Sequence, residues 1–502
     1  MREPADVAPD RRRDRLVRPP AWENPRPRSR YDLVVIGGGT AGLVAAVGGA
    51  GLEAEVALVE RHRLGGDCLN TGCVPSKALL RSARAAAAVR GAEQFGVRVA
   101  GEAAVDFPAV MERMRRLRAK LAAHDAAARL ADLGVDVFFG EARFAGPEVV
   151  AVGHHSLRFR RAIVATGARP AEPPIEGLAE AGFRTSETVF SLEELPPRLG
   201  VVGGGPIGCE LAQAFARFGS EVTLVEMEER LLPADDPDAG AVVARALRED
   251  GVGVATGRTV VRVVSDDGAK RLAIRDGEGS REVVVDEILV AAGRAPNVEG
   301  LGLAAAGIEA EPGEGIAVDE RLRTANRRVY AVGDAIAGPR FTHLSDAQAR
   351  LALRNGLFPG SEKASELVVP WCTYTDPEVA HVGHTPESAA GAGLEIDTVT
   401  RPLDRVDRAV LEGETEGFAR VHVGKGGDEI VGATVVAPHA GEMISEITLA
   451  MKEGVGLVAI GDAIHPYPTV SEAWKGLGDE QRRKRLTPLV SRILRAWFSL
   501  RR

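Results

Sequence analysis

Cysteine is scarce in this chain, with only four among its 502 residues. Four cysteines are too few for a disulfide framework in a chain of this length, which favours a reducing compartment. The sequence also lacks any run of about 18 apolar residues, so it predicts no membrane-spanning helix. Residues 1–30 are rich in Pro and Arg and contain no apolar segment typical of a secretion signal. We therefore expect a cytoplasmic protein whose residues 1–30 form a disordered arm.

The chain carries only a small excess of acidic residues, with a net charge of −8. An acidic body of this kind gives no reason to expect nucleic-acid binding. Its hydrophobic content of 45% is sufficient for several cores. A chain of this length is expected to form about two to four domains.

Two of the four cysteines, Cys68 and Cys73, stand five positions apart in a glycine-containing segment. A helix-compatible run, residues 76–89, follows them. If Cys73 lies in the first helical turn, unpaired backbone N–H groups and the helix dipole favour its thiolate. A thiolate exchanges with disulfides or donates to an electron acceptor. The alternative is a pair of buried structural cysteines, but the nucleotide-binding motifs on either side favour redox chemistry.

A dinucleotide-binding fingerprint precedes the cysteines. Residues 31–36 form an apolar, β-branched strand that ends at a G-x-G-x-x-G turn, and an Ala-rich helix follows the turn. A second strand, residues 55–59, ends at Glu60, eighteen residues after Gly42. A carboxylate at that position binds the ribose hydroxyls of a dinucleotide.

The same pattern recurs further along the chain. A strand ends at Gly203, a helix is expected over residues 209–218, and the next strand ends at Glu226, eighteen residues after Gly208. Two copies of one fingerprint imply two dinucleotides. Because a carboxylate repels a 2′-phosphate, Glu226 favours NADH over NADPH, although Arg230 nearby weakens that preference.

The C-terminal end has a different character. Apolar residues at spacings of three and four from Leu486 to Phe498 predict an amphipathic helix, with Thr487 as its cap. Residues 482–502 contain eight Lys or Arg and no acid. Such a helix suits an anionic membrane surface. Docking of the helix on its own domain is the alternative.

Taken together, these motifs resemble the FAD-dependent pyridine nucleotide-disulfide oxidoreductases, which include dihydrolipoamide dehydrogenase, glutathione reductase and mercuric reductase. The resemblance implies an α/β fold with two Rossmann-like domains, for FAD and NAD(P), and a C-terminal α+β dimerisation domain in a homodimer. The boundaries that we expect are 1–30 for the arm, 31–170 with 295–365 for the FAD domain, 171–294 for the NAD(P) domain, 366–480 for the dimerisation domain and 481–502 for a basic amphipathic tail.

The resemblance also implies roles for individual residues. Cys68 and Cys73 match the redox-active disulfide, while Lys77 and Glu210 match the pair beside the reactive edge of the flavin. The expected FAD-binding residues are Gly37, Gly39, Gly42, Glu60, Lys77, Ala142, Thr166, Gly167 and Asp334. The expected NAD(H)-binding residues, with NADP(H) less favoured, are Gly203, Gly205, Gly208, Glu226 and Gly293. We expect no metal-binding residue.

One departure from the family lies on the substrate side. Disulfide reductases place a histidine directly before a Pro-Thr pair as acid/base, whereas this chain has Tyr467 there and His465 two positions earlier, followed by Glu472. An unperturbed phenol, with a pKa near 10, is a poor base at pH 7. Either His465 substitutes for the missing base or it is structural. The Tyr version looks like mercuric reductase, yet no cysteine follows Cys372.

Three functional hypotheses follow. The first is a dihydrolipoamide dehydrogenase-like enzyme that passes electrons between NAD(P)H, FAD, the Cys68–Cys73 disulfide and a disulfide or dithiol substrate. The second is a mercuric-reductase-like enzyme that acts on a metal ion, a soft electrophile or a quinone. The third is a membrane-surface redox partner that uses residues 482–502.

Overall fold

The computed structural model describes residues 8–101, 104–266, 268–275, 277, 279–484 and 486–502. The chain divides into two compact units. Unit 1 comprises residues 1–203, 217–221 and 260–367, and unit 2 comprises residues 204–216, 222–259 and 368–502. The α/β fold expected from the sequence is confirmed, and each unit is described separately below.

Unit 1 is built on a seven-stranded sheet of order β3-β2-β1-β6-β5-β4, with β18 also paired to β6. Strands β1, β2, β3 and β18 join it in parallel, because each is an apolar run buried on both faces. Their bounds are β1 Tyr31–Ile36, β2 Val56–Glu60, β3 Val135–Phe139, β4 Ala142–Gly146, β5 Val149–Val152, β6 His155–Val164 and β18 Val329–Ala331. The strands predicted from residues 31–36 and 55–59 therefore lie at the centre of this sheet.

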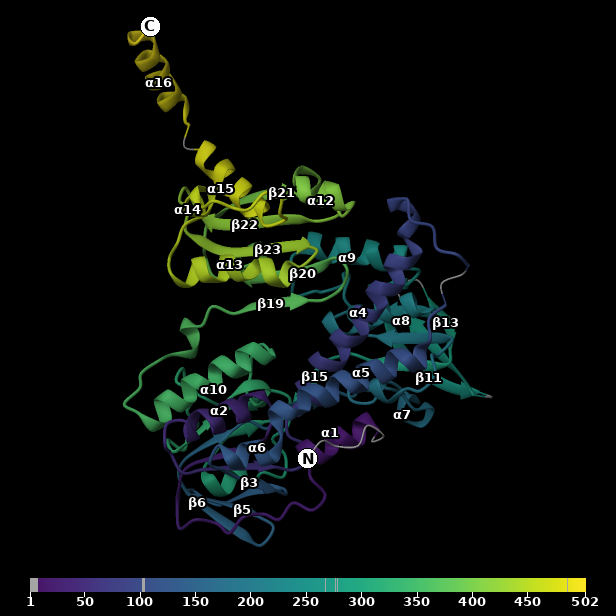
Figure 1. The fold of residues 1–502 in the computed structure, drawn as a ribbon, viewed down its shortest axis with the longest axis vertical. Coiled ribbons are helices and arrows are strands. Elements are labelled where there is room, and N and C mark those ends of the chain that lie inside the picture. The colour runs from purple at the N-terminus through teal and green to yellow at the C-terminus, as the bar shows by residue number, and fades with distance from the viewer. Residues whose placement is uncertain (1–7, 102–103, 267, 276, 278, 485) are drawn as a thin grey trace. The chain divides into compact units, whose positions relative to one another are not determined.

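Helices cover this sheet and carry the cysteine segment. Helices α2 and α10 lie side by side (Figure 1). Helix α5 shows why these segments are helical: Asp106 caps it by accepting from the N–H of Ala109, and its buried residues recur at helical spacing. The α-helices described in this unit are α1 Pro9–Val17, α2 Thr40–Ala50, α3 Gly66–Asn70, α4 Cys73–Arg90, α5 Phe107–Leu121, α6 Ala127–Asp132, α7 Leu178–Ala181 and α10 Thr342–Leu357.

The N-terminal arm differs from the sequence-based expectation. Residues 9–17 form helix α1, and Val17 is fully buried, so the prediction of disorder is wrong for the described part of the arm. Trp22 and Asn24 hydrogen-bond with the backbone of β3, the edge strand of the sheet. Composition could not predict this order, because the arm's own sequence is too polar to form a core and the arm is ordered by contacts with distant residues. Residues 1–7 lie outside the described residues.

The remainder of unit 1 is β-rich. Strand β8 (Arg198–Val202) pairs in parallel with β14 (Glu287–Val290), which precedes Gly293. Strands β11 (Thr259–Asp266), β12 (Ala269–Arg275) and β13 (Ser280–Val285) form a separate sheet. Two short pairs complete the unit: β7 (Ala168–Pro170) with β15 (Arg294–Pro296), and β16 (Ala310–Glu311) with β17 (Gly315–Ile316).

Unit 2 contains a five-stranded antiparallel sheet of order β19-β20-β23-β22-β21. Helix α13 lies against β19, β20 and β23, while α15 lies against β21 and β22, and together they bury the apolar face (Figure 1). The sheet strands are β19 Pro370–Thr373, β20 Glu378–Gly383, β21 Ile396–Pro402, β22 Phe418–Gly424 and β23 Ile430–Ala437. The helices of this part are α11 Pro386–Gly391, α12 Asp407–Glu412, α13 Ala440–Lys452, α14 Leu457–Asp462, α15 Glu472–Lys484 and α16 Pro488–Leu500.

The opposite face of this sheet carries a cluster of polar residues. His381, His422, Thr434 and Arg420 occupy it, and the two histidines are completely buried. Arg420 pairs with Asp236 at 2.7 Å, just before helix α9 (Pro237–Glu249). Strand β9 (Glu221–Val225) pairs in parallel with β10 (Gly253–Ala255), and helix α8 spans Pro206–Phe218. These last elements carry the second fingerprint.

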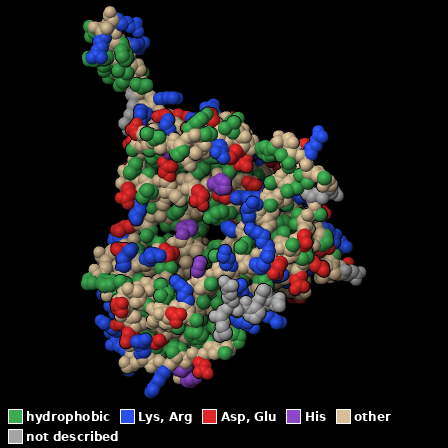
Figure 2. Space-filling model, viewed as in Figure 1, with side chains coloured by type: hydrophobic (Ala, Val, Ile, Leu, Met, Phe, Trp, Pro, Cys, Tyr) green, Lys and Arg blue, Asp and Glu red, His purple; other side chains and the backbone are tan. Residues whose placement is uncertain are grey.

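The predicted C-terminal amphipathic helix is confirmed as α16. The hydroxyl of Thr487 caps it by accepting from the N–H of Val490, as expected. None of its residues is buried, so its apolar side chains remain exposed. Figure 2 shows apolar and basic side chains next to one another on this helix. Among the described residues, no helix is both long and apolar enough to cross a membrane.

Candidate redox site

The two cysteines meet where helix α3 ends and α4 begins. Cys68 lies in α3, and Cys73 is the first residue of α4, with Gly72 as its N-cap. The positive φ of Gly65 and Gly66 allows the chain to turn sharply into α3. The prediction that Cys73 occupies the first helical turn is thus confirmed. The helix dipole consequently favours a negative charge on this sulfur.

Cys68 and Cys73 are not joined by a disulfide in the structure, and their thiols interact with each other. The hydrogen bond from Cys68 outweighs the opposing effect of burial and lowers the pKa of Cys73 to about 6, with further help from Thr342 and the charge of Lys77. The same hydrogen bond and burial raise the pKa of Cys68 far above its usual range. This asymmetry makes Cys73 the thiolate and Cys68 its proton donor at neutral pH.

Thr342 is a site residue that sequence reasoning missed. Its hydroxyl Oγ1 lies 3.3 Å from Sγ of Cys73, and it is the first residue of α10. Two helix N-termini therefore meet at one sulfur. Thr342 belongs to none of the motifs recognised in the sequence, so no local signal identified it.

A chain of charged side chains adjoins residues 65–73, which form the cysteine turn, or redox turn. Nη2 of Arg294 lies 2.5 Å from Oδ2 of Asp67, the residue before Cys68, and Nε of Arg294 lies 3.6 Å from Asp334. Burial raises the pKa of Asp334, while Arg294 acts in the opposite direction. Asp334 was predicted to bind FAD, but Asp67 and Arg294 were not recognised from the sequence. The three charges connect the redox turn to the expected flavin site.

The first glycine turn fits a dinucleotide. A Cβ on Gly37 would lie 2.3 Å from the carbonyl oxygen of Ala165, and one on Gly42 would lie 1.8 Å from that of Gly37, so side chains are excluded at both positions. No side chain caps the N-terminus of α2 at Gly39. A phosphate is the usual partner of such a glycine-rich helix N-terminus. The N–H of Gly65 donates to Gly38, which joins the cysteine turn to this one.

Glu60 and Glu226 hold the two glycine turns in the same way. Oε2 of Glu60 accepts from the N–H of Gly38 at 2.7 Å, and Oε1 accepts from His62. Oε2 of Glu226 accepts from Gly204, and Oε1 accepts from Glu228. Burial raises the pKa of Glu60, although its backbone hydrogen bonds counteract this effect. The internal repeat recognised in the sequence is therefore a repeat of hydrogen bonding as well.

The remaining predicted cofactor residues lie in loops and at the ends or within elements of the two units. Oγ1 of Thr166 donates to the carbonyl of Asn297 at 2.7 Å, and Gly167 has a φ of 68°. Ala142 begins β4. Gly203 ends the first segment of unit 1, Gly205 precedes α8, Gly208 lies within α8, and Gly293 follows β14 with a φ of 95°. Their roles in binding stay predictions.

Lys77 and Glu210 belong to different units. Lys77 lies one helical turn after Cys73 on α4, as expected from the spacing. Glu210 is 4% exposed in α8, and its Oε1 accepts from the N–H of Tyr374 at 2.9 Å. Their pairing beside a flavin stays a prediction.

His465 and Tyr467 have different environments within unit 2. The side chain of His465 is 6% exposed, with Nδ1 3.1 Å from the carbonyl of Ala463 and Nε2 3.1 Å from Glu446. Tyr467 is 70% exposed, and its hydroxyl donates to Asp407 at 3.0 Å. That hydrogen bond raises the pKa of Tyr467, which therefore stays a neutral phenol. Glu472 begins α15 close by and lines a cavity of about 200 Å³ with Tyr467.

The other two cysteines have different surroundings. Cys209 is fully buried in α8, where burial raises its pKa, and its thiol donates to the carbonyl of Gly204. Cys372 is half-buried in β19. A buried, protonated thiol such as Cys209 is unreactive. Among the described residues, no group of three or more His, Cys, Asp or Glu is arranged to hold a metal ion.

Comparison with known proteins agrees with this geometry. The profile of the family described as pyridine nucleotide-disulphide oxidoreductase matches residues 31–349, and that of its dimerisation domain matches residues 369–477. The chain belongs to the pyridine nucleotide-disulphide oxidoreductase family. It is accordingly an FAD-dependent oxidoreductase with NAD(P) as co-substrate. The resemblance inferred from its motifs is confirmed.

Relatives of this oxidoreductase include enzymes with different substrates. It is 35% identical over 445 residues to a mercuric reductase of Bacillus cereus, covering 89% of this chain and 70% of that protein. It is 37% identical over 446 residues to a dihydrolipoyl dehydrogenase of Thermus scotoductus, covering 88% of this chain and 95% of that protein. A solved structure, the Cu(II) complex of the HOCl-induced flavoprotein disulfide reductase RclA from Escherichia coli, superimposes with a TM-score of 0.80 at 29% identity, covering 90% of this chain and 99% of that chain.

Proposed function

We propose that this protein is a homodimeric, NADH-dependent reductase of a small-molecule disulfide, with Cys68 and Cys73 as its redox pair. The position of Cys73 as the first residue of α4, with its sulfur 3.3 Å from the hydroxyl of Thr342 and in interaction with Cys68, carries the proposal. The overall reaction is NADH + H⁺ + RSSR → NAD⁺ + 2 RSH. It runs equally in reverse with a dithiol as donor. The matched dimerisation domain supports the homodimer.

The chain's own residues account for the sulfur chemistry. Cys68 gives its proton to the Cys73 thiolate as it attacks the substrate disulfide, which breaks the S–S bond and releases one RS⁻. Cys73 passes that proton to the departing RS⁻, which leaves as RSH. The Cys73 thiolate then attacks the sulfur of Cys68 and displaces the second RS⁻, which takes a proton from solvent. The pair is left as a Cys68–Cys73 disulfide, oxidised by two electrons, and RSSR is reduced to 2 RSH. FAD, when bound, supplies the two-electron relay that restores the dithiol from NADH. The first glycine turn, in which side chains are excluded at Gly37 and Gly42, and the hydrogen bond from Gly38 to Glu60 support binding of this cofactor.

Anaerobic titration of the purified holoenzyme with NADH tests this proposal. A long-wavelength band typical of a thiolate beside oxidised flavin is expected in the wild type. The band should disappear in Cys73→Ser and persist in Cys68→Ser. Absence of the band in the wild type would reject the assigned role of Cys73.

A mercuric-reductase-like activity is the second candidate, and the environment of Tyr467 favours it. A neutral phenol that is 70% exposed is a poor base for a dithiol, yet it remains available to a soft metal ion held by thiolates. Two of the relatives described above act on different substrates according to their names. Steady-state rates with lipoamide and with Hg(II) separate the two candidates. A higher kcat/KM for Hg(II) would replace the first proposal with the second.

The exposed helix α16 supports peripheral contact with an anionic membrane. Leu489, Ile493 and Trp497 are each more than half exposed on a helix whose charged residues are all basic. Such a helix binds by inserting its apolar face while its arginines contact lipid phosphates.

Sedimentation with vesicles tests the contribution of this helix. The wild type is expected to co-sediment with vesicles containing phosphatidylglycerol but not with pure phosphatidylcholine, and binding should be lost in Arg492→Glu/Arg495→Glu. Lys120→Glu reverses an exposed charge on α5 and serves as the matched control. Equal binding of all three proteins would reject the proposed contact.

A further inference from the structure

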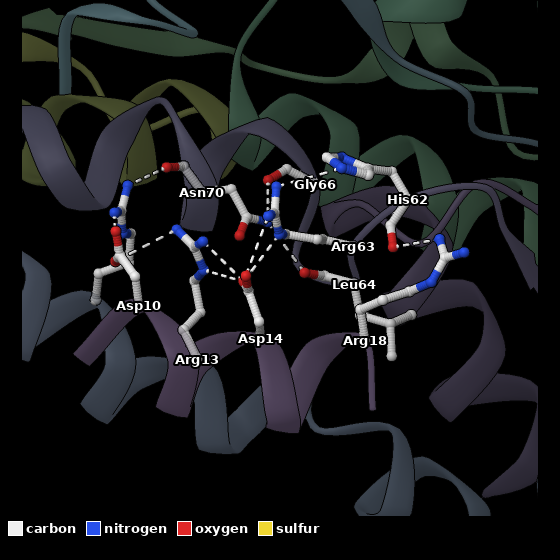
Figure 3. A network of polar contacts seen from close by, with 10 residues as sticks. Asp10, Arg13, Asp14, Arg18, His62, Arg63, Leu64, Gly66 and Asn70 are labelled. Carbon is white, nitrogen blue, oxygen red and sulfur yellow. Dashed lines mark hydrogen bonds and ion pairs between the residues drawn. The ribbon is translucent and has the colours of Figure 1, made fainter. Parts of the chain in front are cut away.

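The N-terminal segment lies outside the family profile, which begins at residue 31. Hydrogen bonds and ion pairs nevertheless connect it to the segment that leads into the turn that carries Cys68. Figure 3 shows the contacts, with Asp10, Arg13, Asp14 and Arg18 of the arm facing His62, Arg63, Leu64 and Asn70. All of these residues belong to unit 1. This segment therefore contacts residues 61–64, which lead into the redox turn, and is linked to Asn70 through Arg118.

The first set of contacts holds residues 61–64. Nε and Nη2 of Arg63 donate to the two carboxylate oxygens of Asp14, at 2.9 and 3.1 Å. Nη1 of Arg18 donates to the carbonyls of Arg61 and His62, at 2.6 and 2.8 Å. The N–H of Leu64 donates to the carbonyl of Val17 at 3.1 Å. The segment that connects Glu60 to the cysteine turn is thus held along its whole length.

The second set of contacts reaches beyond Cys68. Arg118, which is 4% exposed, donates through Nη2 to Asp10 and through Nη1 to the carbonyl of Asn70, both at 2.7 Å. Nδ2 of Asn70 donates to the carbonyls of Leu64 and Gly66. Cys68 therefore lies between two residues, Gly66 and Asn70, whose positions depend on α1. A buried guanidinium needs a carboxylate, and here α1 supplies it.

The arm has a third set of contacts, which does not involve the cysteine turn. Asn24 pairs with the backbone of Phe139 at 2.8 and 2.9 Å, and Arg28 pairs with Asp136 at 2.9 Å. These contacts cover the edge of the sheet and stabilise it. They are separate from those of Asp10 and Asp14. The chain thus offers a matched control that loosens the arm without affecting the turn.

We propose that Asp10 and Asp14 of α1 are positioning residues that act through Arg118 and Arg63 to hold Cys68 in hydrogen-bonding contact with Cys73. This proposal rests on the redox role of the cysteine pair proposed above. Neither aspartate contacts the sulfurs. Asp10 binds Arg118, which donates to the backbone carbonyl of Asn70. Asp14 binds Arg63, which lies in the segment that leads into the turn. When these contacts weaken, the turn spends less time in the geometry in which Cys68 donates to Cys73.

The test uses the full-length holoenzyme, fully reduced under anaerobic conditions. The pH midpoint of Cys73 alkylation by iodoacetamide is measured by mass spectrometry in wild type, Asp10→Asn, Asp14→Asn and the double variant, alongside the melting temperature. The midpoint should rise by about one pH unit in the double variant, because the thiolate loses its hydrogen-bond donor. Each single variant should show part of this rise. Flavin content is measured in parallel and should stay stoichiometric.

Asn24→Ala is the control variant. It is expected to lower the melting temperature while leaving the midpoint at the wild-type value. The proposal is overturned if Asp10→Asn and Asp14→Asn change only the melting temperature, as Asn24→Ala does. If the double variant does not fold, the two single variants decide between these outcomes. Failure of the proposed function is distinct, since wild-type enzyme would then form no Cys68–Cys73 disulfide on oxidation.

Discussion

The sulfur of Cys73 lies 3.3 Å from the hydroxyl of Thr342, a residue 269 positions further along the chain. Each of these residues begins a helix, α4 and α10 respectively. The partial positive charges of both helix N-termini thus converge on one sulfur, and the hydroxyl adds a hydrogen bond. This arrangement adds to the stabilisation of the Cys73 thiolate, to which the hydrogen bond from Cys68 makes the largest contribution.

Replacement of Thr342 by Val should raise the pKa of Cys73 by about one unit, because a hydrogen bond to a charged acceptor is lost. The wild-type thiolate, with a pKa of about 6, is almost complete at pH 7, whereas the variant would reach the same fraction only near pH 8. The pH midpoint of the thiolate–flavin absorption band in NADH-reduced enzyme measures this shift. Thr342→Ser retains the hydroxyl and should behave as wild type. An unchanged midpoint in Thr342→Val would show that the hydroxyl has no electrostatic role.

Glu226 should set the preference for NADH. Glu226 follows the last residue of β9, and Nη2 of Arg230 donates to the carbonyl of Pro233 at 2.9 Å. Glu226→Gln keeps an acceptor for Gly204 but removes the charge that repels a 2′-phosphate. The ratio of kcat/KM for NADPH over NADH should rise roughly tenfold, which corresponds to about 1.4 kcal/mol.

Glu60→Gln is the matched control for this prediction, because Glu60 holds the first glycine turn in the same way. It should affect flavin retention and leave the NADPH/NADH ratio unchanged. A ratio that changes equally in both variants would contradict the assignment of the second turn to the nicotinamide dinucleotide.

Tyr467 and His465 should respond differently to substitution. Tyr467→Phe removes an exposed hydroxyl and should lower kcat/KM for the oxidising substrate by roughly tenfold to a hundredfold. Because the hydrogen bond to Asp407 raises the pKa of Tyr467, its ionisation should not appear in the pH–rate profile below pH 9. His465→Asn should lower the melting temperature and leave the pH–rate profile unchanged. Loss of a neutral-pH inflection in His465→Asn would instead identify the histidine as the acid/base.

The buried histidines of unit 2 should make the protein sensitive to acid. Burial lowers the pKa of both His381 and His422 to about 4 in the folded state. Above pH 6.5 both are neutral in folded and unfolded chains. As the pH falls from 6.5 towards 4, the unfolded chain binds protons that the folded chain excludes, so stability is lost. Each histidine should lower the free energy of unfolding by about 2 kcal/mol when the pH is lowered from 8 to 5.

His422→Asn tests this dependence. Nδ1 of His422 is 2.9 Å from Thr398, whereas its buried Nε2 has no hydrogen-bond partner among the described residues. Asparagine can retain the contact with Thr398 without the titratable ring. Urea unfolding at pH 8 and pH 5 should show a smaller loss of stability in the variant than in wild type. An identical loss would mean that His422 does not contribute.

Local sequence determined much of this protein. The apolar β-branched run before Gly37 forms β1, the glycines at 37, 39 and 42 exclude side chains, and the residues after Cys73 form a helix. These features depend on neighbours within a few positions, so that their spacing alone predicts them. The family followed from the same motifs and from the repeat that ends in Glu60 and Glu226.

Tertiary structure decided the features that depend on residues far apart in sequence. Thr342 reaches Cys73, Arg294 reaches Asp67, and Arg118 connects α1 to the cysteine turn, all over separations that no spacing rule relates. The N-terminal arm is helical only because the surface of unit 1 supplies the partners for its charges. Sequence thus specified the cysteine pair, the glycine turns and their neighbouring strands and helices, whereas long-range packing brought together the side chains that tune Cys73.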